Sequence, residues 1–373
     1  MRILYISKSI IPSRTANSIH VMKMCQAFSD NGHEIVLLAP DQKNQYEKSV
    51  DNIYEYYGVK KNFVIKKLWH PNLKIGAFLY TLAIFFYLLK NKNFNLIYGR
   101  FLHGCYLATL FKKKVIFESH ESIYDMKNHR MIIFKKLISS RYFKKLVVIS
   151  QVLKNMYLEN KILNEDKIQI AHDGADEVLN FNTKIDLSGD KNSFKVGYVG
   201  HLYKGRGIEL IIECAKRIND TSFHIVGGTN DDIEYWKNYV KNLRLFNIHF
   251  YGFVSPKKTS YYRNSFDIVL APYAKQVSVF GNAGDTSKFM SPLKIFEYMS
   301  HKKAIIVSDL PVLREVLNEK NSILVKSDDL NGWVRAINKL KIYENREKIA
   351  NYAFNDFKSY TWNNRVKQLI DRE

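Results

Sequence analysis

The chain has 373 residues, of which 46% are hydrophobic and 25% are charged, and its formal net charge at pH 7 is +21. This length favours two domains over a single core, and the composition excludes a disordered chain. The three cysteines, Cys25, Cys105 and Cys214, lie far apart in the sequence. Their spacing predicts neither a disulfide framework nor a metal site, so a reducing cytosol is the expected compartment.

The basic excess has two explanations, which are binding to a polyanion and a general richness in lysine. The sequence contains no nucleic-acid-binding module and no low-complexity arm, so we expect no nucleic-acid partner. Residues 126–158 nevertheless contain eight Lys or Arg residues and no Asp or Glu. Within them, residues 127–154 alternate apolar and basic groups at helical spacing. This pattern predicts either a basic amphipathic helix on an anionic membrane or a core-packed helix with solvated lysines.

The first half of the chain alternates short β-rich runs with helical segments. A helix is predicted over residues 18–32, where Gly32 ends it. The longest apolar run, residues 75–89, has about fifteen residues, which is fewer than the roughly twenty needed to span a bilayer. We therefore predict a buried helix there, with a membrane-embedded helix as the alternative. The predicted strands are residues 2–8, 33–40, 94–100, 114–120, 145–150 and a final strand and turn within 167–181.

The second half repeats this alternation after a polar, turn-rich linker at residues 182–194. Predicted strands cover residues 195–200, 223–228, 248–254, 268–273 and 304–309. The whole chain is therefore predicted to be an α/β protein with two doubly wound, Rossmann-like parallel sheets. Ligands of such sheets bind outside the carboxyl ends of the strands, so a cleft between the two domains is the expected site.

The loop after the predicted strand 195–200 combines glycine with positive charge. Gly200, Gly205 and Gly207 allow the backbone to approach a ligand, and Lys204 and Arg206 lie among them. The following helix begins near Gly207, and its N-terminus favours an anion. The glycine spacing matches neither the dinucleotide fingerprint nor a phosphate-binding P-loop. The loop alone is therefore weak evidence for a phosphate site, because Lys and Arg residues in a loop are usually solvated.

A second helix start lies in the stretch "SPLKIFE", residues 291–297. Ser291 suits an N-cap and Pro292 the first helical position. Lys294 and Glu297 then lie one turn apart on one side. Backbone N–H groups and the ammonium group would bind an anion, while the Glu297 carboxylate would accept hydrogen bonds from vicinal hydroxyls such as those of a ribose. The alternative is a simple surface Lys–Glu pair.

Together these motifs resemble the C-terminal domain of family 4 glycosyltransferases, which have the GT-B fold. The resemblance rests on "VGHLYKGRGIELI", "FHIVGG", "IHFYGFVSP" and "SPLKIFEYMS", which occur in this order, and the "SPLK-x-x-E" form is similar to one branch of the family. The N-terminal stretches "SRTANSIHVMKM" and "VIFESHE" agree with it. The resemblance implies an N-terminal acceptor-side domain over residues 1–183, a nucleotide-sugar-binding domain over residues 195–355, and a last helix, residues 356–373, that crosses back to the N-terminal domain.

The family transfers a sugar from a nucleoside-diphosphate donor with retention of configuration, and it requires no metal or other cofactor. By resemblance, Arg206 replaces the lysine that grips the diphosphate, and Glu297 is the second glutamate of a pair, the one that holds the ribose. The first glutamate would fall at Phe289, which removes a carboxylate from the donor sugar, and Asp285 is a candidate to replace it. His201 stands where the family often has an arginine. The other implied donor-binding residues are Ser291, Pro292, Leu293, Gly200, Gly252 and Val254.

In the N-terminal half, His120 ends a predicted strand. The resemblance implies that it bonds the transferred sugar or assists the acceptor, with Glu121 as a neighbouring candidate. Asn17 and Ser18 stand where the family often has paired glycines near the donor phosphates, and His20 is a weaker candidate. We expect Arg206, Lys294 and two helix N-termini to stabilise the departing diphosphate. These two cations, together with His120, are the predicted catalytic groups.

The expected function is therefore glycosyl transfer to a glycan or lipid-linked acceptor, in bacterial surface polysaccharide synthesis such as capsule or lipopolysaccharide O-antigen. The expected location is the cytoplasm, with peripheral attachment to the inner face of the cytoplasmic membrane through basic residues 127–154. Two alternatives remain open at this point. A GT-B sugar-nucleotide epimerase would use the same pocket without an acceptor, and a non-enzymatic lipid- or nucleic-acid-binding protein would use only the charge. The sequence specifies neither the sugar nor the nucleotide base.

Overall fold

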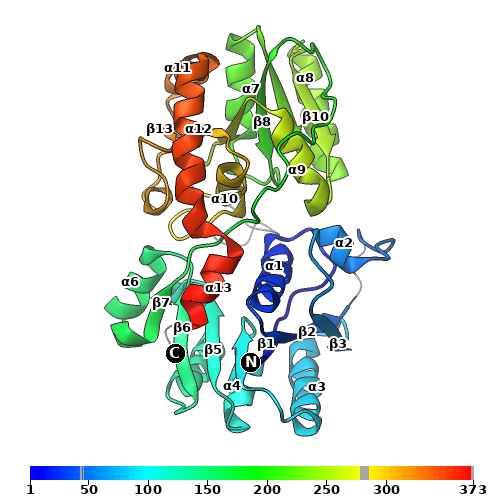
Figure 1. Ribbon diagram of the computed structural model, residues 1–373, viewed down its shortest axis with the longest axis vertical. Helices are drawn as coiled ribbons and strands as arrows, with labels where there is room; N and C mark the ends of the chain where they lie inside the picture. The colour runs from blue at the N-terminus through cyan, green and yellow to red at the C-terminus, as the bar shows by residue number, and fades with distance from the viewer. Residues whose placement is uncertain (43, 45, 278–284, 371–373) are drawn as a thin grey trace. The chain divides into compact units, whose positions relative to one another are not determined.

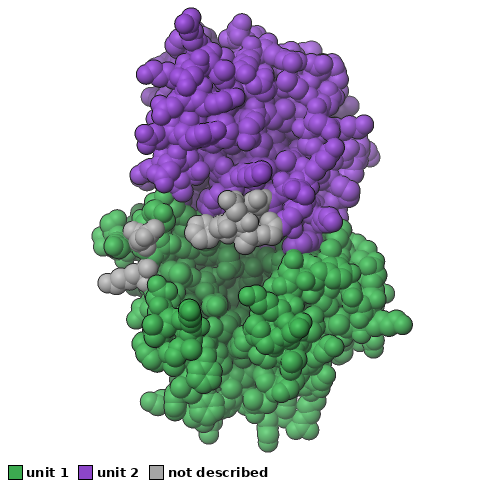
Figure 2. Space-filling view, turned by 180° about the vertical axis from the view of Figure 1, so that it is seen from behind, with its two compact units in different colours: residues 1–172, 362–373 green, residues 173–361 purple. Residues whose placement is uncertain are grey.

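The computed structural model describes residues 1–42, 44, 46–277 and 285–370. Contacts between residues divide the chain into two units, which Figure 2 distinguishes by colour. Unit 1 contains residues 1–172 and 362–373, and unit 2 contains residues 173–361. The first unit is therefore built from two stretches that are separated in sequence by the whole of the second.

Unit 1 has a seven-stranded parallel sheet in the order β3-β2-β1-β4-β5-β6-β7. The chain leaves β1 toward β2 and β3, then returns to the other side of β1 with β4. This reversal is the switch point at which doubly wound sheets bind ligands. The strands are β1 Arg2–Ile6, β2 Glu34–Asp41, β3 Val64–Trp69, β4 Leu96–Gly99, β5 Val115–Ser119, β6 Phe143–Val148 and β7 Ile168–Ile170.

Helices flank the sheet of unit 1 (Figure 1). The first of them is capped by Thr15, whose side chain accepts a hydrogen bond from the N–H of Ser18, and it ends before Gly32, which has a φ of +80°. The last helix of the chain packs against the first, and Lys145 Nζ donates to the carbonyl of Leu369 at 2.7 Å. The helices are α1 Ala16–Asp30, α2 Ile53–Tyr57, α3 Gly76–Lys90, α4 Leu102–Leu110, α5 Asn128–Ile138, α6 Gln151–Glu159 and α13 Trp362–Ile370.

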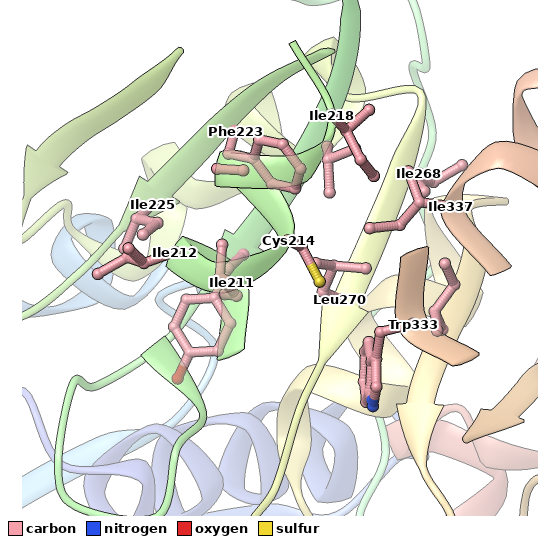
Figure 3. Packing of buried hydrophobic residues seen from close by; sticks show 14 of the residues in the cluster. Ile211, Ile212, Cys214, Ile218, Phe223, Ile225, Ile268, Leu270, Trp333 and Ile337 are labelled. Carbon is pink, nitrogen blue, oxygen red and sulfur yellow. The ribbon is translucent and has the colours of Figure 1, made fainter. Parts of the chain in front are cut away.

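Unit 2 has a six-stranded parallel sheet in the order β10-β9-β8-β11-β12-β13. Its switch point lies between β8 and β11. Figure 3 shows the packing of its core, where Phe223, Ile268 and Trp333 are fully buried. The elements are β8 Phe194–Val199, α7 Ile208–Arg217, β9 Thr221–Val226, α8 Asn230–Asn242, β10 Ile248–Gly252, α9 Pro256–Ser265, β11 Ile268–Ala271, α10 Leu293–Ser300, β12 Ala304–Ser308, β13 Ile323–Val325, α11 Leu330–Lys341 and α12 Tyr343–Phe357.

The prediction of two doubly wound parallel sheets is confirmed, but the boundaries differ from those predicted. Residues 173–183 belong to unit 2, because Asn264 Nδ2 donates to the carbonyls of Asn180 and Thr183. The predicted final helix, residues 356–373, is divided. Its first part completes α12 and a 3₁₀ turn in unit 2, and α13 begins only at Trp362 in unit 1.

The basic segment 127–154 does not form one amphipathic helix, so that prediction is wrong. It contains α5, the buried strand β6 and the start of α6. In α5 the side chains of Phe134 and Leu137 are buried, whereas Lys135 and Lys136 are exposed. The alternative, a helix that packs on the core and keeps its lysines in solvent, describes α5 correctly.

The prediction of a buried helix at residues 75–89 is wrong for one face of α3. Tyr80, Ile84 and Leu88 are buried, but the opposite face of the helix is exposed and apolar. No helix within the described residues is long and apolar enough to cross a membrane.

Candidate functional site

The loop that follows β8 brings its backbone close to other parts of unit 2. Gly205 has a φ of +84°, and a Cβ atom there would lie 2.1 Å from the carbonyl oxygen of Gln276. Gly207, with a φ of +74°, precedes α7 and would meet the carbonyl of Pro272 in the same way. Only glycine fits both positions, because the left-handed backbone and the close approach each disfavour a side chain.

Lys294 lies in the first turn of α10 and is 9% exposed. Its Nζ is 3.8 Å from the ring centroid of Tyr198 and 5.4 Å from that of Tyr273. Among the residues that the structure describes, none forms a hydrogen bond with this ammonium group. Burial, and then the charge of Arg206, lower the pKa of Lys294 well below its usual value, and Glu297 opposes them only in part.

Arg206 brings a second cation to the same place. Its backbone N–H donates to the carbonyl of Tyr203 at 3.0 Å, and its Cζ lies 5.6 Å from the ring centroid of Tyr273. Tyr273 is therefore within cation–π range of both Arg206 and Lys294. Burial raises the pKa of Tyr273 to about 12, so this phenol is neutral. Two neighbouring basic side chains and a neutral aromatic ring therefore form a site with a positive potential, which favours the binding of an anion.

The start of α10 differs from the sequence prediction. The helix begins at Leu293, and Pro292 is its N-cap without a side-chain hydrogen bond. Ser291 does not cap the helix, because its Oγ accepts a hydrogen bond from the N–H of Asp173 at 2.9 Å. The N–H groups of the first turn therefore receive no side-chain cap, and they add to the positive potential around Lys294.

Glu297 lies one turn beyond Lys294 but does not pair with it, since no ion pair joins the two among the described residues. Its Oε2 accepts a hydrogen bond from Arg263 Nη1 at 3.1 Å, and the Arg263 side chain is only 5% exposed. Glu297 itself keeps 27% of its side chain exposed. The simple surface Lys–Glu pair is therefore excluded. Arg263 was missed by sequence reasoning, because nothing near it in the chain marks it as a partner of Glu297.

The residues predicted around the donor sugar are less open than expected. Phe289 is buried. The Asp285 carboxylate accepts hydrogen bonds from the N–H groups of Val277 and Ser287, both at 2.9 Å. Partial burial acts to raise the pKa of Asp285, but these bonds lower it. Asp285 thus links Val277 to Ser287. Residues 278–284 lie outside the described residues, and the contact of Asp285 with a sugar stays a prediction.

The remaining predicted donor-binding residues surround the carboxyl ends of the strands of unit 2. A Cβ atom at Gly200, which has a φ of +155°, would lie 2.6 Å from Lys294 Nζ, so this ammonium group lies against the loop backbone. The His201 ring stacks on Tyr203 with a centroid separation of 4.7 Å. Gly252, with a φ of +70°, ends β10, and Val254 packs against the core two residues later.

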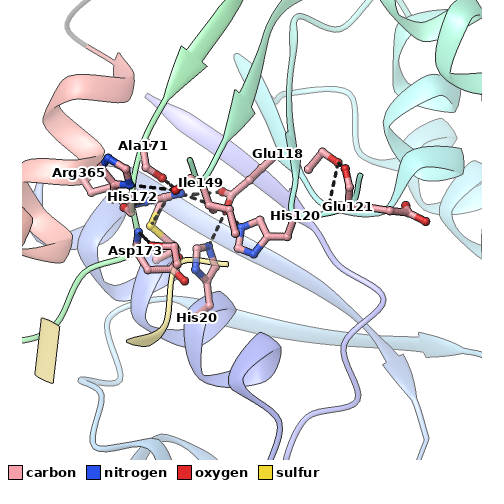
Figure 4. A network of polar contacts seen from close by, with 12 residues as sticks. His20, Glu118, His120, Glu121, Ile149, Ala171, His172, Asp173 and Arg365 are labelled. Atoms are coloured by element: carbon pink, nitrogen blue, oxygen red, sulfur yellow. Dashed lines mark hydrogen bonds and ion pairs between the residues drawn. The ribbon is translucent and has the colours of Figure 1, made fainter. Parts of the chain in front are cut away.

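In unit 1 the carboxylate of Glu118 is the centre of a buried polar network, which Figure 4 shows. Arg365 Nη2 of α13 donates to its Oε1 at 3.1 Å, and His20 Nε2 of α1 lies 2.9 Å from the same oxygen. His120 Nε2 lies 2.5 Å from Oε1, and the hydroxyl of Tyr98 donates to Oε2. Four segments of unit 1 therefore converge on one carboxylate at the end of β5.

Glu118 remains ionised in this setting. Burial alone would raise its pKa, but Arg365, His20 and the hydrogen bonds from the two histidines hold the pKa well below its usual value. The carboxylate can therefore orient the His120 ring, whose side chain is 21% exposed, whereas His20 is buried against Trp362. Sequence reasoning found both histidines but missed Glu118 and Arg365. The acidic residue two positions before His120 was the one available signal.

The other predicted residues of unit 1 make contacts within the unit. Ser18 is buried, and its hydroxyl donates to the carbonyl of Ser13 at 2.8 Å. Asn17 is exposed and donates to Ser9 Oγ at 2.7 Å. Glu121 accepts a hydrogen bond from Arg130 Nη1 at 2.6 Å. The structure thus brings His20 and His120 together, but it gives Asn17, Ser18 and Glu121 separate partners.

Comparison with known proteins identifies the class to which this fold and site belong. Residues 18–178 match the family described as Glycosyltransferase Family 4, and residues 193–341 match Glycosyl transferases group 1. The two matches occur in the order of the two units, and the sheets are those of the GT-B fold. The chain is therefore a glycosyltransferase of the GT-B class, similar to family 4.

Individual relatives agree with this class. An uncharacterised glycosyltransferase of Methanocaldococcus jannaschii is 26% identical over 96% of this chain and 94% of its own length. Sucrose-phosphate synthase of Thermosynechococcus elongatus has a TM-score of 0.74 at 14% identity and covers 100% of this chain and 98% of its own. HepE of Anabaena, solved in complex with UDP, has a TM-score of 0.73 at 13% identity and covers 100% of both chains. At these identities the solved structures show the fold alone.

Proposed function

We propose that this glycosyltransferase uses a nucleoside-diphosphate sugar whose diphosphate binds Lys294 and Arg206. The observation that carries the proposal is the buried ammonium group of Lys294, which has no hydrogen-bond partner among the described residues and lies near a second cation. Burying a cation without a hydrogen-bond partner destabilises the folded protein. A phosphate oxygen would accept a hydrogen bond from the ammonium group and so compensate for this cost. The N-termini of α7 and α10 would contribute N–H groups to the same anion.

Glu297 would hold the ribose hydroxyls of the donor. Its carboxylate is fixed by the buried Arg263 and remains partly accessible, so it can accept hydrogen bonds from a ligand. The related structure of HepE in complex with UDP-glucose supports a uridine nucleotide as the first donor to test.

The chemical step follows from the charge that develops on the leaving diphosphate. Preorganised cations and helix N-termini would stabilise that charge without a metal ion, so we propose metal-independent transfer. No carboxylate in the described part of the donor site is placed as a nucleophile, so we propose that retention arises by same-face attack and not through a covalent glycosyl-enzyme, which would also retain configuration. For unit 1 we propose that His120, oriented by Glu118, bonds a hydroxyl of the transferred sugar or of the acceptor. A glycan or lipid-linked glycan of a bacterial surface polysaccharide is the proposed acceptor class.

The proposal is tested by measuring UDP binding to purified Lys294→Met by calorimetry. Removing a charge-assisted contact of about 1.5–3 kcal/mol should weaken binding by roughly 10- to 150-fold. Lys241→Met, on the exposed side of α8, is the matched control and should bind like the wild type. Affinity of Lys294→Met within twofold of the wild type would contradict the assignment.

Turnover tests the reaction itself. Incubation with a panel of sugar nucleotides, with and without EDTA, should give donor hydrolysis or transfer that EDTA does not change. Loss of activity in EDTA would show that a metal is required and would refute the metal-independent step. Conversion of the donor to a different sugar nucleotide without any acceptor would instead identify an epimerase.

A further inference from the structure

The outer face of α3 carries a continuous apolar stripe in solvent. Its members, spaced three or four residues apart, are between 40 and 67% exposed. This spacing places them on one side of a helix. We call them the α3 stripe: Ile75, Phe78, Leu82, Phe86 and Leu89.

The fully buried side chains of α3 lie on the face opposite to the stripe. They are Tyr80, Ile84 and Leu88, and the Tyr80 hydroxyl donates to the carbonyl of Ser7 at 2.7 Å. A helix that is apolar on all sides is ordinarily covered on all sides. In a soluble protein, a contiguous exposed apolar surface of this kind marks an interaction site.

The apolar surface extends beyond both ends of the helix. Trp69 and Leu73, which precede α3, are 61% and 62% exposed. At the other end Leu110 of α4 is also exposed, and the contact between the Phe85 and Phe111 rings, with centroids 5.5 Å apart, holds this end of α4 beside α3.

The stretch of sequence that contains the stripe carries only basic charged residues. Residues 56–117 contain eleven Lys or Arg residues and no Asp or Glu. Lys74 and Lys90 lie at the two ends of α3, and both are exposed. Lys113 Nζ donates to the carbonyl of Phe94 at 3.4 Å, which brings the basic run 112–114 beside the chain that leaves α3. An apolar centre with lysines at its margins is complementary to an anionic lipid surface.

We propose that the α3 stripe docks unit 1 on a lipid bilayer that contains anionic lipid. The apolar side chains would enter the boundary between headgroups and acyl chains, while the long lysine side chains reach the headgroup phosphates. α3 would lie in the plane of the membrane, because its fifteen residues extend only about 22 Å, less than the hydrocarbon core.

A second copy of the chain is a poorer occupant for the same surface. A two-fold symmetric interface places the same patch on both partners. Because residues 56–117 contain no carboxylate, the lysines around the two stripes would face one another without a counter-charge. On an anionic membrane, the lipid headgroups would supply the counter-charge for these lysines.

The docking surface is tested by co-sedimentation with vesicles of phosphatidylcholine alone or with phosphatidylglycerol. The wild type should bind the anionic vesicles. The double substitution Phe78→Ser and Phe86→Ser changes only exposed side chains, so its circular dichroism and melting temperature should match the wild type while binding falls at least tenfold. Phe246→Ser, which alters an exposed phenylalanine of unit 2, is the matched control and should bind normally.

Tryptophan fluorescence supplies a second readout at the site itself. Trp236, Trp333 and Trp362 are buried, whereas Trp69 beside α3 is exposed. Brominated anionic lipid should therefore quench mainly Trp69, and Trp69→Phe should remove most of the quenching. Quenching should also fall in Lys90→Gln combined with Lys92→Gln, and it should decrease as salt is raised.

Three results would overturn the proposal. The first is unchanged vesicle binding in the double serine variant. The second is binding that is lost only when Lys135 and Lys136 of α5 are replaced by glutamine. The third is a lipid-free dimer that the double serine variant converts to monomers in analytical ultracentrifugation, because it would assign the stripe to a second copy. None of these results bears on UDP binding, so the docking surface and the donor site are tested separately.

Discussion

The ammonium group of Lys294 has unfavourable surroundings in the ligand-free protein. It is buried, it lies in the first turn of a helix, and Arg206 contributes a like charge. Replacing this side chain by methionine should therefore raise the unfolding free energy of the ligand-free protein by about 1–3 kcal/mol while weakening UDP binding. Denaturant titration checks the first effect, and a destabilised variant would show that the contact of the ammonium group with the Tyr198 ring outweighs the cost of its burial.

Proton uptake on binding provides a pH test of the same group. Because the pKa of Lys294 is lowered in the ligand-free protein, a bound diphosphate should raise it again toward the ordinary value of about 10.4. Between the lowered and the ordinary pKa, binding therefore takes up a proton, and affinity falls as pH rises through this window. Calorimetry in buffers of different ionisation enthalpy measures the uptake, which should disappear in Lys294→Met.

Substitutions that break the Glu118–Arg365 pair should lower the stability of unit 1 strongly. Arg365→Met leaves a buried carboxylate without its main counter-charge, so we expect a loss of about 3–5 kcal/mol at pH 7. Glu118 has a lowered pKa in the folded state, so its contribution is present above the unfolded pKa of about 4.3. It is lost as pH falls below that value. The difference between wild type and variant should therefore shrink on acidification, as measured by chemical denaturation.

A double substitution, Glu118→Gln with Arg365→Met, serves as the control. It should recover part of the lost stability at pH 7, since neither side chain then leaves an unpaired buried charge. Additive losses in the double variant would show that the two residues act independently.

At the scale of elements, the loop between β8 and α7 depends on glycine for its backbone path. Gly205→Ala would force a Cβ atom to within 2.1 Å of the Gln276 carbonyl at a φ of +84°. The backbone must then shift, at a cost of roughly 1–3 kcal/mol, and Arg206 shifts with it. We expect a lower melting temperature and weaker UDP binding together.

Gly189→Ala provides the comparison, because that glycine also has a positive φ, of +91°, but lies in the turn before β8. It should lower the melting temperature without a change in UDP affinity. Equal effects of the two substitutions on UDP affinity would contradict the role given to the loop.

The elements that sequence reasoning found are those with a buried apolar run. It missed β3, whose side chains are largely exposed at the edge of the sheet, and β13, which has only three residues. It placed Lys294 and Glu297 on one helix correctly, because helical spacing is a local property. Their true partners could not be read in the same way. Tyr198, Tyr273 and Arg263 reach them only through the folding of unit 2.

At the scale of the whole chain, the resemblance between sequence motifs and a known family was sufficient for the GT-B class but not for the limits of the units. Polar composition suggested a linker at residues 182–194, yet hydrogen bonds from Asn264 tie residues 180 and 183 to unit 2. The Glu118–Arg365 contact joins residues 247 positions apart. No local pattern in a single sequence reports a contact at that separation.

The return of the chain to unit 1 at Trp362 has a consequence for biosynthesis. During translation, residues 1–172 leave the ribosome first, with Glu118 and the α1 surface complete but Arg365 and α13 still absent. All of unit 2 is synthesised before they arrive. During this interval Glu118 lacks the charge of Arg365 and one side of α1 is uncovered, and exposed apolar surface of this kind favours aggregation. A premature stop codon shortly before Trp362 would leave unit 2 intact and would make that incomplete state of unit 1 permanent.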